Sequence, residues 1–219
     1  MKNLVIAIDG PAGAGKSTVA QLAAKKLNYT YIDTGAMYRA VAWKALQQAA
    51  LPITDAVICD LVKDIQVDLQ YRDGRIFVLV DGRDVTGEIR TPAVTGIVSQ
   101  VARLAPVRAK MVVLQRHMAE RGAVVMDGRD IATNVLPGAD VKIFLTASID
   151  ERAKRRWKEM QAKGYAVDLA ELKKEIAARD KADSEREISP LVKAEDAALL
   201  DTTGMSIDAV VQAVLDMCR

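Results

Sequence analysis

Three glycines and a lysine near the start of the chain have the spacing of a phosphate-binding loop. The stretch GPAGAGKST at residues 10–18 fits the pattern G-x-x-x-x-G-K-[ST], with Gly15, Lys16 and Ser17 towards its end. An apolar run precedes this loop and a helical pattern follows it, as the motif requires. Glycines let successive backbone amides turn inward around phosphate oxygens, and the positive end of the following helix faces the same anion. We therefore expect the loop to hold the phosphates of a nucleoside triphosphate.

Two side chains of the loop are expected to act on the phosphates directly. Lys16 would reach the β and γ oxygens, and the Ser17 hydroxyl would hold Mg²⁺. The predicted ATP-binding residues of the loop are Gly10, Pro11, Ala12, Gly13, Ala14, Gly15, Lys16, Ser17 and Thr18. A plain glycine-rich turn with a solvated lysine is the alternative, and the rarity of the pattern disfavours it. The chain has neither the Asn-Lys-x-Asp of guanine-reading switches nor the Leu-Ser-Gly-Gly-Gln of transporter ATPases, so a small kinase fits best.

Two later segments put charged residues where buried strands are expected to end. Residues 33–39 (DTGAMYR) follow a short apolar run and open a helix that Thr34 is expected to cap. Residues 127–130 (DGRD) follow another apolar run. Either segment alone is also typical of a solvated helix start or a polar turn. Ligands of open α/β sheets bind along the carboxyl edge of the strands, so two such segments beside one P-loop indicate a shared site.

Arginines in the last third of the chain indicate the chemistry of the acceptor. They form two groups, which are Arg152, Arg155 and Arg156 on one expected helix, and Arg179 and Arg186 with Asp183 on one face of another. Taken singly, each group is also typical of exposed ion pairs. Together they predict an anionic acceptor, because guanidinium groups are bidentate donors to phosphate. A phosphate monoester, whose second pKa is about 6, attacks without a general base. The single histidine, His117, is accordingly expected on a helix surface without a catalytic role.

Short apolar runs separated by helical patterns predict a mainly parallel sheet covered by helices on both faces. The runs span 4–8, 31–32, 123–126, 141–145 and 197–200. Helices are expected to start at Thr91-Pro92, at Pro106 and at a capping box from Ser148 to Glu151. We expect an α/β fold of the P-loop NTPase type, with three layers and a five-stranded core sheet, in a single domain over residues 1–219.

One region departs from this alternation of apolar runs and helical patterns. Residues 65–69 and 75–80 have strand patterns on either side of Arg72-Asp73-Gly74, in which Asp-Gly is a hairpin turn signal. Antiparallel strands do not belong to a parallel sheet. We therefore interpret about residues 61–95 as part of a small inserted lobe that contains β-structure.

Composition limits the classes of partner. Hydrophobic residues make up 50% of the 219-residue chain, enough to bury the core of one domain. The formal net charge is only +2, so no overall field predicts binding to a nucleic acid polymer or to a membrane surface. Cys59 and Cys218 lack metal-ligand spacing, and neither a secretion leader nor a long apolar run is found. We expect a cytoplasmic monomer whose partners are small-molecule nucleotides.

At these residues the sequence resembles the bacterial cytidylate kinases, which belong to the nucleoside monophosphate kinase group. The likeness covers essentially the whole chain, and its motifs lie at 6–18, 33–39, 98–102, 107–108, 127–130 and 179–186. It implies an enzyme that transfers the γ-phosphoryl group of ATP, with Mg²⁺, to CMP or dCMP and releases ADP. It also implies that the insert belongs to the lobe that binds the nucleoside monophosphate. A helical lid at about residues 148–166 would close over the transferring group.

The resemblance implies a role for each matching residue. The CMP site would consist of Thr34, Arg39, Ser99, Arg108, Arg129, Asp130, Arg179, Asp183 and Arg186. Cytosine would be read by Thr34, Arg108, Asp130 and Arg186, the sugar by Ser99, Arg179 and Asp183, and the acceptor phosphate by Arg39 and Arg129. Asp130 suits cytosine because a carboxylate accepts from its N4 donor. Arg155 of the lid would bind ATP, and the catalytic residues would be Lys16, Arg129, Arg152 and Arg156.

The chain departs from the family pattern at two positions. Thr34 stands where members carry Ser, which keeps the hydroxyl. Ala132 stands where many members read Gly, and it would be strained if this position needs a positive φ. Asp33 and Asp127 are both candidates for assisting Mg²⁺ through water.

Two other functions remain open at this point. A kinase of UMP, dTMP or a small hydroxy acid would share the P-loop, with Asp33 as the base for a hydroxyl acceptor. A regulatory protein that binds ATP and hydrolyses it slowly or not at all would need no acceptor site.

Overall fold

The chain divides into two compact units. The computed structural model describes residues 3–48, 52–72, 75–162 and 164–219. Unit 1 comprises residues 1–31 and 122–219, and unit 2 comprises residues 32–121. No helix within the described ranges is both long and apolar enough to cross a membrane.

Unit 1 is built on the sheet that carries the phosphate-binding loop. Its strands are β1 (Val5–Asp9), β6 (Val124–Gly128), β7 (Val141–Thr146) and β8 (Ala198–Asp201), together with β2 (Thr30–Asp33), which begins in this unit. In the described residues the strand order is β2-β6-β1-β7-β8. β1 is parallel to β6 and β7, and β7 is parallel to β8. The predicted five-stranded, mainly parallel sheet is confirmed, and the strands differ from the predicted runs by one or two residues at their ends.

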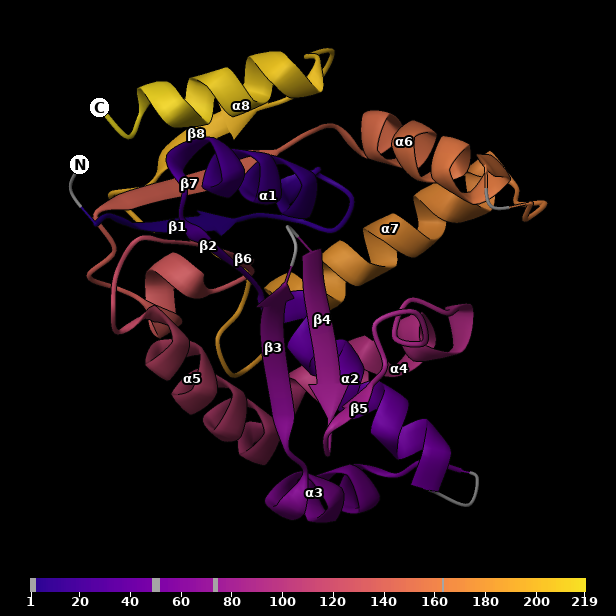
Figure 1. Ribbon diagram of the computed structural model, residues 1–219. Helices are drawn as coiled ribbons and strands as arrows, with labels where there is room; N and C mark the ends of the chain where they lie inside the picture. Colours follow the sequence, from indigo (N-terminus) through magenta and orange to yellow (C-terminus); the bar gives the residue numbers. More distant parts are fainter. Residues whose placement is uncertain (1–2, 49–51, 73–74, 163) are drawn as a thin grey trace. The chain divides into compact units, whose positions relative to one another are not determined.

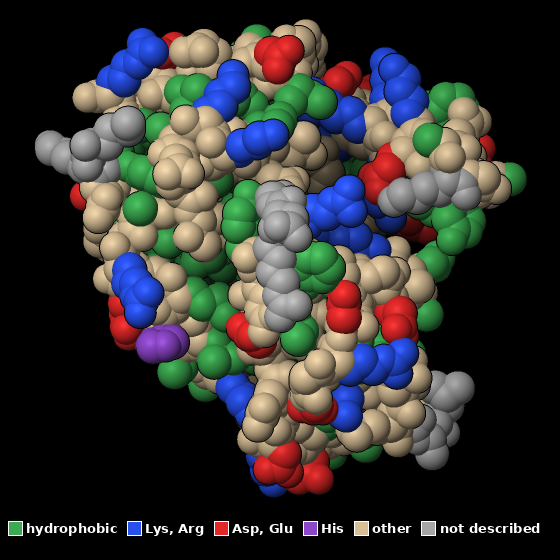
Figure 2. Space-filling model, viewed as in Figure 1, with side chains coloured by type: hydrophobic (Ala, Val, Ile, Leu, Met, Phe, Trp, Pro, Cys, Tyr) green, Lys and Arg blue, Asp and Glu red, His purple; other side chains and the backbone are tan. Residues whose placement is uncertain are grey.

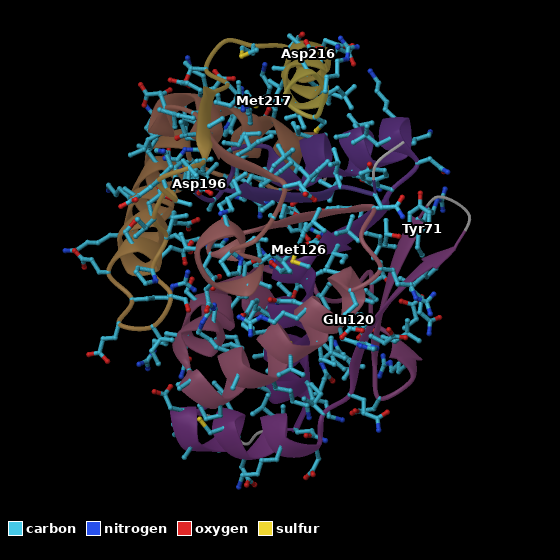
Figure 3. All side chains as sticks on the ribbon, turned by 90° about the vertical axis from the view of Figure 1, so that its left-hand side faces the viewer. Tyr71, Glu120, Met126, Asp196, Asp216 and Met217 are labelled. Carbon is cyan, nitrogen blue, oxygen red and sulfur yellow. The ribbon has the colours of Figure 1, made fainter. Side chains whose placement is uncertain are left out.

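The central strands are apolar because both of their faces are covered. Ile6 and Ile8 of β1 are fully buried, as is Met126 of β6. Figure 3 shows Met126 well inside the fold, whereas Met217 lies at the far end of the last helix. The register pairs Asp9 with Gly128, so the loops that follow β1 and β6 leave the sheet side by side.

Unit 1 also contains α-helices and a π-helix. They are α1 (Lys16–Leu27), the π-helix η1 (Ile131–Val135), α6 (Ile149–Ala162), α7 (Leu169–Ser184) and α8 (Ile207–Asp216). α1 packs on β6 and against α8, and Figure 1 shows these two helices side by side. α6 and α7 pack against each other. Ser148 caps the start of α6 as predicted, because its Oγ accepts a hydrogen bond from the Glu151 amide at 3.2 Å.

Unit 2 combines helices with a small antiparallel sheet. Its elements are α2 (Thr34–Gln48), α3 (Asp55–Asp64), β3 (Val67–Arg72), β4 (Arg75–Val80), β5 (Arg83–Asp84), α4 (Pro92–Arg103) and α5 (Ala105–Ala119). β4 pairs antiparallel with β3 and β5, and these strands lie within the predicted insert at 61–95. The predicted Asp73-Gly74 turn lies outside the described residues. α2 packs against α3, α4, α5 and the sheet, and its buried Met37 and Val41 belong to the core of this unit.

The two helix starts predicted in unit 2 from capping residues had different outcomes. Thr91 caps α4 as predicted, since its Oγ1 accepts from the Val94 amide at 3.3 Å. The prediction that Thr34 caps α2 is wrong. Asp33 is the cap, and its Oδ1 accepts from the Ala36 amide at 2.9 Å. The helix begins at Thr34, so the residue before it occupies the capping position and reaches the third amide.

Candidate active site

The phosphate-binding loop has the backbone geometry that its glycines predict. A side chain at Gly10 would overlap the carbonyl oxygen of Leu145 in β7, so only glycine allows the loop to leave β1 this close to its neighbour. Gly15 precedes α1 in the left-handed region, with a φ of 94°. In the described residues no side chain caps this helix, which leaves its first amides available to an anion.

Carbonyl oxygens of the loop are engaged by positive side chains of unit 1. Lys16 Nζ donates to the Pro11 carbonyl at 2.8 Å. Arg152 Nη1 donates to the Ala12 carbonyl at 2.9 Å, and Arg155 Nη1 reaches the Ala14 carbonyl at 3.4 Å. Carbonyl oxygens carry partial negative charge and would repel phosphate, and these cations bind three of them.

Lys16 is a buried cation whose charge depends on its surroundings. Only 5% of its surface is exposed. Burial lowers its pKa to about 7, and the positive charge of Arg129 lowers it in the same direction, while Asp127 and Asp9 oppose the shift. A bound triphosphate would restore the positive form, because an adjacent opposite charge favours it. The lysine is thus matched to an anionic ligand.

Ser17 and Asp127 lie together beside the loop. The Ser17 hydroxyl donates to Asp127 Oδ2 at 3.0 Å, and the Tyr31 hydroxyl donates to Oδ1 at 2.7 Å. Asp127 is buried near the end of β6, where its register partner is Ile8 of β1. Asp33 is engaged elsewhere, within unit 2, where Arg90 Nη2 donates to its Oδ2 at 2.8 Å. Of the two candidate magnesium carboxylates, Asp127 is therefore the one in contact with Ser17.

Arginines of unit 1 cluster around the buried Asp183. Arg129 Nε donates to Asp183 Oδ2 at 2.8 Å. Burial alone would raise the pKa of Asp183, but Arg129 and the neighbouring guanidinium groups hold it below its ordinary value. Burial lowers the pKa of Arg179 to about 10, and the charges of Arg129 and Arg156 act in the same direction. Figure 2 shows Lys and Arg side chains gathered over the region of α6 and α7. Such a cluster favours a bound anion.

The loop after β6 is held in place by a residue that the sequence analysis did not single out. Asp9, the last residue of β1, accepts from the Ile131 amide at 2.8 Å and from the Ala132 amide at 2.7 Å. Burial raises its pKa to about 6, and these two hydrogen bonds partly oppose the shift. An acidic residue at the end of an otherwise apolar strand was the signal that could have revealed it.

Asp130 and Ala132 belong to this same loop. Asp130 is buried, and Asn134 Nδ2 donates to its Oδ2 at 3.0 Å. The strain considered for Ala132 is absent. Among the described residues other than glycine, those with a positive φ are Asn28, Asp81, Ala123 and Ser189. The loop accommodates alanine because η1 starts here with a backbone that any residue adopts.

The three predicted lid arginines have different environments. Arg152 is buried, with 4% of its surface exposed, and it pairs with Asp180 at 2.7 Å. Arg155 pairs with Glu151 at 2.9 Å and donates to the Thr202 carbonyl at 2.8 Å. Arg156 is half-buried, as Arg155 is, and forms an ion pair with Glu159 at 3.1 Å.

Two predictions about helix faces were tested at α5 and α7. His117 lies exposed on α5, 3.1 Å from Glu120, as predicted. Arg186 does not share a helix face with Arg179 and Asp183, because α7 ends at Ser184. Arg186 follows the end of the helix, and its Nε donates back to the Asp183 carbonyl at 3.3 Å.

Unit 2 carries the other predicted CMP-binding residues on three helices that pack together. Arg39 on α2 donates to Thr95 Oγ1 at 2.9 Å. Arg108 on α5 is buried, and its guanidinium carbon lies 5.6 Å from the centre of the Tyr38 ring. Thr34 is buried at the start of α2, and Ser99 is half-buried on α4. Arg90, which pairs with Asp33, is a further basic residue of this unit that the sequence analysis did not assign.

The fold and the site define a class of protein before any relative is considered. A parallel sheet whose first strand leads through a glycine-rich loop into a helix, with a buried lysine and an arginine cluster in the same unit, is the architecture of a P-loop kinase. The crystal structure of an uncharacterized protein from Eubacterium ventriosum has a similar fold. Its TM-score is 0.54 at 14% identity, with 98% of this chain and 97% of that chain covered.

The chain belongs to the cytidylate kinase family. The family model for cytidylate kinase matches residues 6–219. The cytidylate kinase of Bacillus cereus is 53% identical over 216 residues, which cover 99% of this chain and 96% of that protein. The cytidylate kinase of Bacillus thuringiensis is 53% identical over 214 residues, which cover 98% of this chain and 95% of that protein.

Proposed function

We propose that this protein transfers the γ-phosphoryl group of ATP to CMP and dCMP, giving ADP and the nucleoside diphosphate. Membership of the cytidylate kinase family supports this acceptor. The observation that carries the proposal is the group formed by the half-buried Arg179, Arg129 and the Asp183 to which Arg129 donates, in the same unit as the P-loop. Like charges held together in this way are stabilised by a bound anion, and a nucleoside monophosphate is such an anion.

The reaction would be an in-line transfer between two phosphates. An oxygen of the acceptor phosphate bonds to the γ-phosphorus while the bond from that phosphorus to the β–γ bridging oxygen breaks. Most of the acceptor is already a dianion at neutral pH, so no side chain has to remove a proton. Lys16, Arg129 and Arg156 would neutralise the charge that develops on the transferring group.

Mg²⁺ fits the pair formed by Ser17 and Asp127. Both residues present hard oxygen atoms, and these lie 3.0 Å apart. Mg²⁺ is usually bound through one or two protein oxygens together with substrate phosphates and water, which this pair can provide. When bound, the ion neutralises charge on the β- and γ-phosphates. Asp33 is less suited to this role because it already caps α2 and pairs with Arg90.

Selection of cytosine would depend on Asp130. A carboxylate only accepts hydrogen bonds, so it complements the N4 amino group of cytosine and opposes the O4 acceptor of uracil. The Asn134 amide contacts one oxygen of Asp130 and orients the group. For Thr34, Arg108 and Arg186 the proposed role in reading the base rests on membership of the family.

A panel of acceptors tests this function. We expect CMP and dCMP to exceed UMP, dTMP and hydroxy acids in kcat/KM by about tenfold or more, which corresponds to about 1.4 kcal/mol. The measurement is ADP release in a coupled assay with each acceptor. Equal rates with UMP and CMP would refute the base assignment. ATP binding without transfer to any acceptor would favour a regulatory protein instead.

We also propose that the enzyme is a monomer in the cytoplasm. Cys59 and Cys218 are free thiols in the structure, which suits a reducing compartment. Size-exclusion chromatography with light scattering should give the mass of one chain, with and without nucleotides. A stable dimer mass would contradict this assignment.

A further inference from the structure

Arg152 has a contact pattern unlike that of a side chain poised to close on a phosphate. Each of its three nitrogen positions donates within unit 1. Nε donates to the Ala147 carbonyl at 2.9 Å, Nη1 to the Ala12 carbonyl at 2.9 Å, and Nη2 to the Asp180 carboxylate at 2.7 Å. To contact a phosphate, the buried Arg152 would have to leave its ion pair with Asp180 and two carbonyl groups, which would leave polar atoms without partners.

The contacts of Arg152 converge on the middle of the phosphate-binding loop. Ala12 accepts its Nη1 hydrogen bond, and the next residue, Gly13, packs against it. A Cβ at Gly13 would meet the Cβ of Arg152 at 3.4 Å. Gly13 has a positive φ of 75°, so it is at a point where the loop turns. The guanidinium group therefore holds the carbonyl immediately before this turn, and the stem of the side chain fills the space beside it.

Asp180 holds Arg152 in this position from α7. Its Oδ2 pairs with Arg152, and within the described part of the chain its buried Oδ1 has no hydrogen-bond partner. Arg152 is the ion-pair partner of this half-buried carboxylate, and Arg179 is a second positive charge near it. Arg179 also belongs to the arginine cluster with Arg129.

We propose that Arg152 and Asp180 form a clamp that positions the phosphate-binding loop, so that Arg152 is a positioning residue for ATP and not a catalytic arginine of the lid. The clamp links α6 and α7 to the Ala12 carbonyl and favours the loop conformation in which successive amides face the phosphates. This inference rests on the proposed function only in taking ATP as the ligand of the loop.

The first test is the substitution Asp180→Asn, which keeps the shape of the side chain and removes its charge. We expect the Kd for ATP, measured by titration calorimetry without acceptor, to rise about tenfold, while the KM for CMP stays within about twofold. The matched control is Asp150→Asn. Asp150 pairs with Lys173 at 2.7 Å and also joins α6 to α7, but this pair is exposed. We expect the control to bind ATP as the wild type does.

A second variant keeps the test decisive if Asp180→Asn does not fold. The double substitution Arg152→Met with Asp180→Leu removes both charges and leaves apolar side chains in their place, a change that buried ion pairs often tolerate. Circular dichroism should report a folded protein, and the Kd for ATP should again rise about tenfold. Wild-type ATP affinity in the folded double variant would overturn the proposal. An equal rise in the KM for CMP and the Kd for ATP in Asp180→Asn would also overturn it.

Because the readout is ATP binding, this test is separate from the test of phosphoryl transfer. If the acceptor panel fails and the Kd for ATP still rises in Asp180→Asn, the clamp stands and the proposed acceptor is wrong. A crystal structure with a non-hydrolysable ATP analogue gives a direct view. We expect Arg152 still paired with Asp180 in that complex, and an Arg152 guanidinium on the phosphates would contradict the clamp.

Discussion

The phosphate-binding loop at 10–18 and the charged loop at 127–132 follow neighbouring parallel strands but are built in different ways. The first loop offers backbone amides, and its shape follows from its own glycines. The second loop offers side chains, and those of Asp127 and Arg129 are held by partners distant in sequence. Ser17 contacts Asp127, and Asp183 contacts Arg129. Local sequence therefore suffices to recognise the donor loop, while the side-chain loop depends on the assembled fold.

The largest effect that this comparison predicts is at Lys16, whose positive charge is expected to act on the transferring group. We expect Lys16→Met to lower kcat by about a hundredfold to a thousandfold with every acceptor, because a buried charge facing the phosphates is lost. The measurement is a coupled assay with CMP, dCMP and UMP. The ratio of CMP to UMP activity should not change. A variant that lost base preference along with rate would show that the two loops are not independent.

The next largest effect is expected at Asp127, where the two loops touch through Ser17. We expect Asp127→Asn to lower kcat by about a hundredfold and to raise the Mg²⁺ concentration needed for half-maximal rate, because a hard anionic oxygen is replaced by an amide. A magnesium titration of the initial rate measures both quantities. Asp33→Asn is the matched control and should keep the wild-type magnesium midpoint. A shifted midpoint in the control alone would reverse the assignment.

A smaller and more selective effect is expected at Asp130 in the side-chain loop. Asp130→Ala should reduce the preference for CMP over UMP from about tenfold to near unity, because the acceptor for the N4 amino group is lost. The comparison uses kcat/KM for both nucleotides. ATP binding, measured without acceptor, should stay within about twofold. An unchanged base preference would remove Asp130 from the base site.

The smallest effect is a dependence of stability on pH that arises from the donor loop. The pKa of Lys16 is about 7 in the folded protein, below the ordinary value of 10.5. Between these values the unfolded chain holds a proton that the folded chain has released, so the contribution of Lys16 to the free energy of unfolding rises with pH. Urea unfolding at pH 7, 8 and 9 should show this rise in the difference between the wild type and Lys16→Met. A difference that stays constant over this range would contradict the lowered pKa.

Asp9 contacts the loop after β6. Its pKa is shifted upward, whereas the pKa of Lys16 is shifted downward. The pKa of Asp9 is about 6 when folded and 3.8 ordinarily. Between these values the folded chain holds the extra proton, so the contribution of Asp9 to the free energy of unfolding falls as pH rises. The two groups therefore titrate in different pH ranges.

Much of the fold was predictable because its signals are local. Apolar runs of two to five residues predicted the strands, and Thr91 and Ser148 predicted the starts of α4 and α6. The predictions were wrong where two neighbouring residues could both cap a helix, and where a helix ended before the predicted residue. Asp and Thr are both residue types that cap helices. Because α2 begins at Thr34, Asp33 occupies the capping position. Arg186 keeps the helical spacing in sequence, but α7 ends before it.

What the sequence by itself determined is the phosphate-binding loop and the kind of sheet that carries it. Both depend on interactions between residues close in the chain, namely glycine conformations, the helix terminus and continuous apolar runs. Only the tertiary structure decided that Asp127 contacts Ser17, that Asp9 holds the loop after β6, and that Arg152 is buried against Asp180. Two of these contacts join residues more than 100 positions apart, and the third links different helices. Burial then sets the charges of the groups involved, and no local pattern encodes burial of a particular polar side chain.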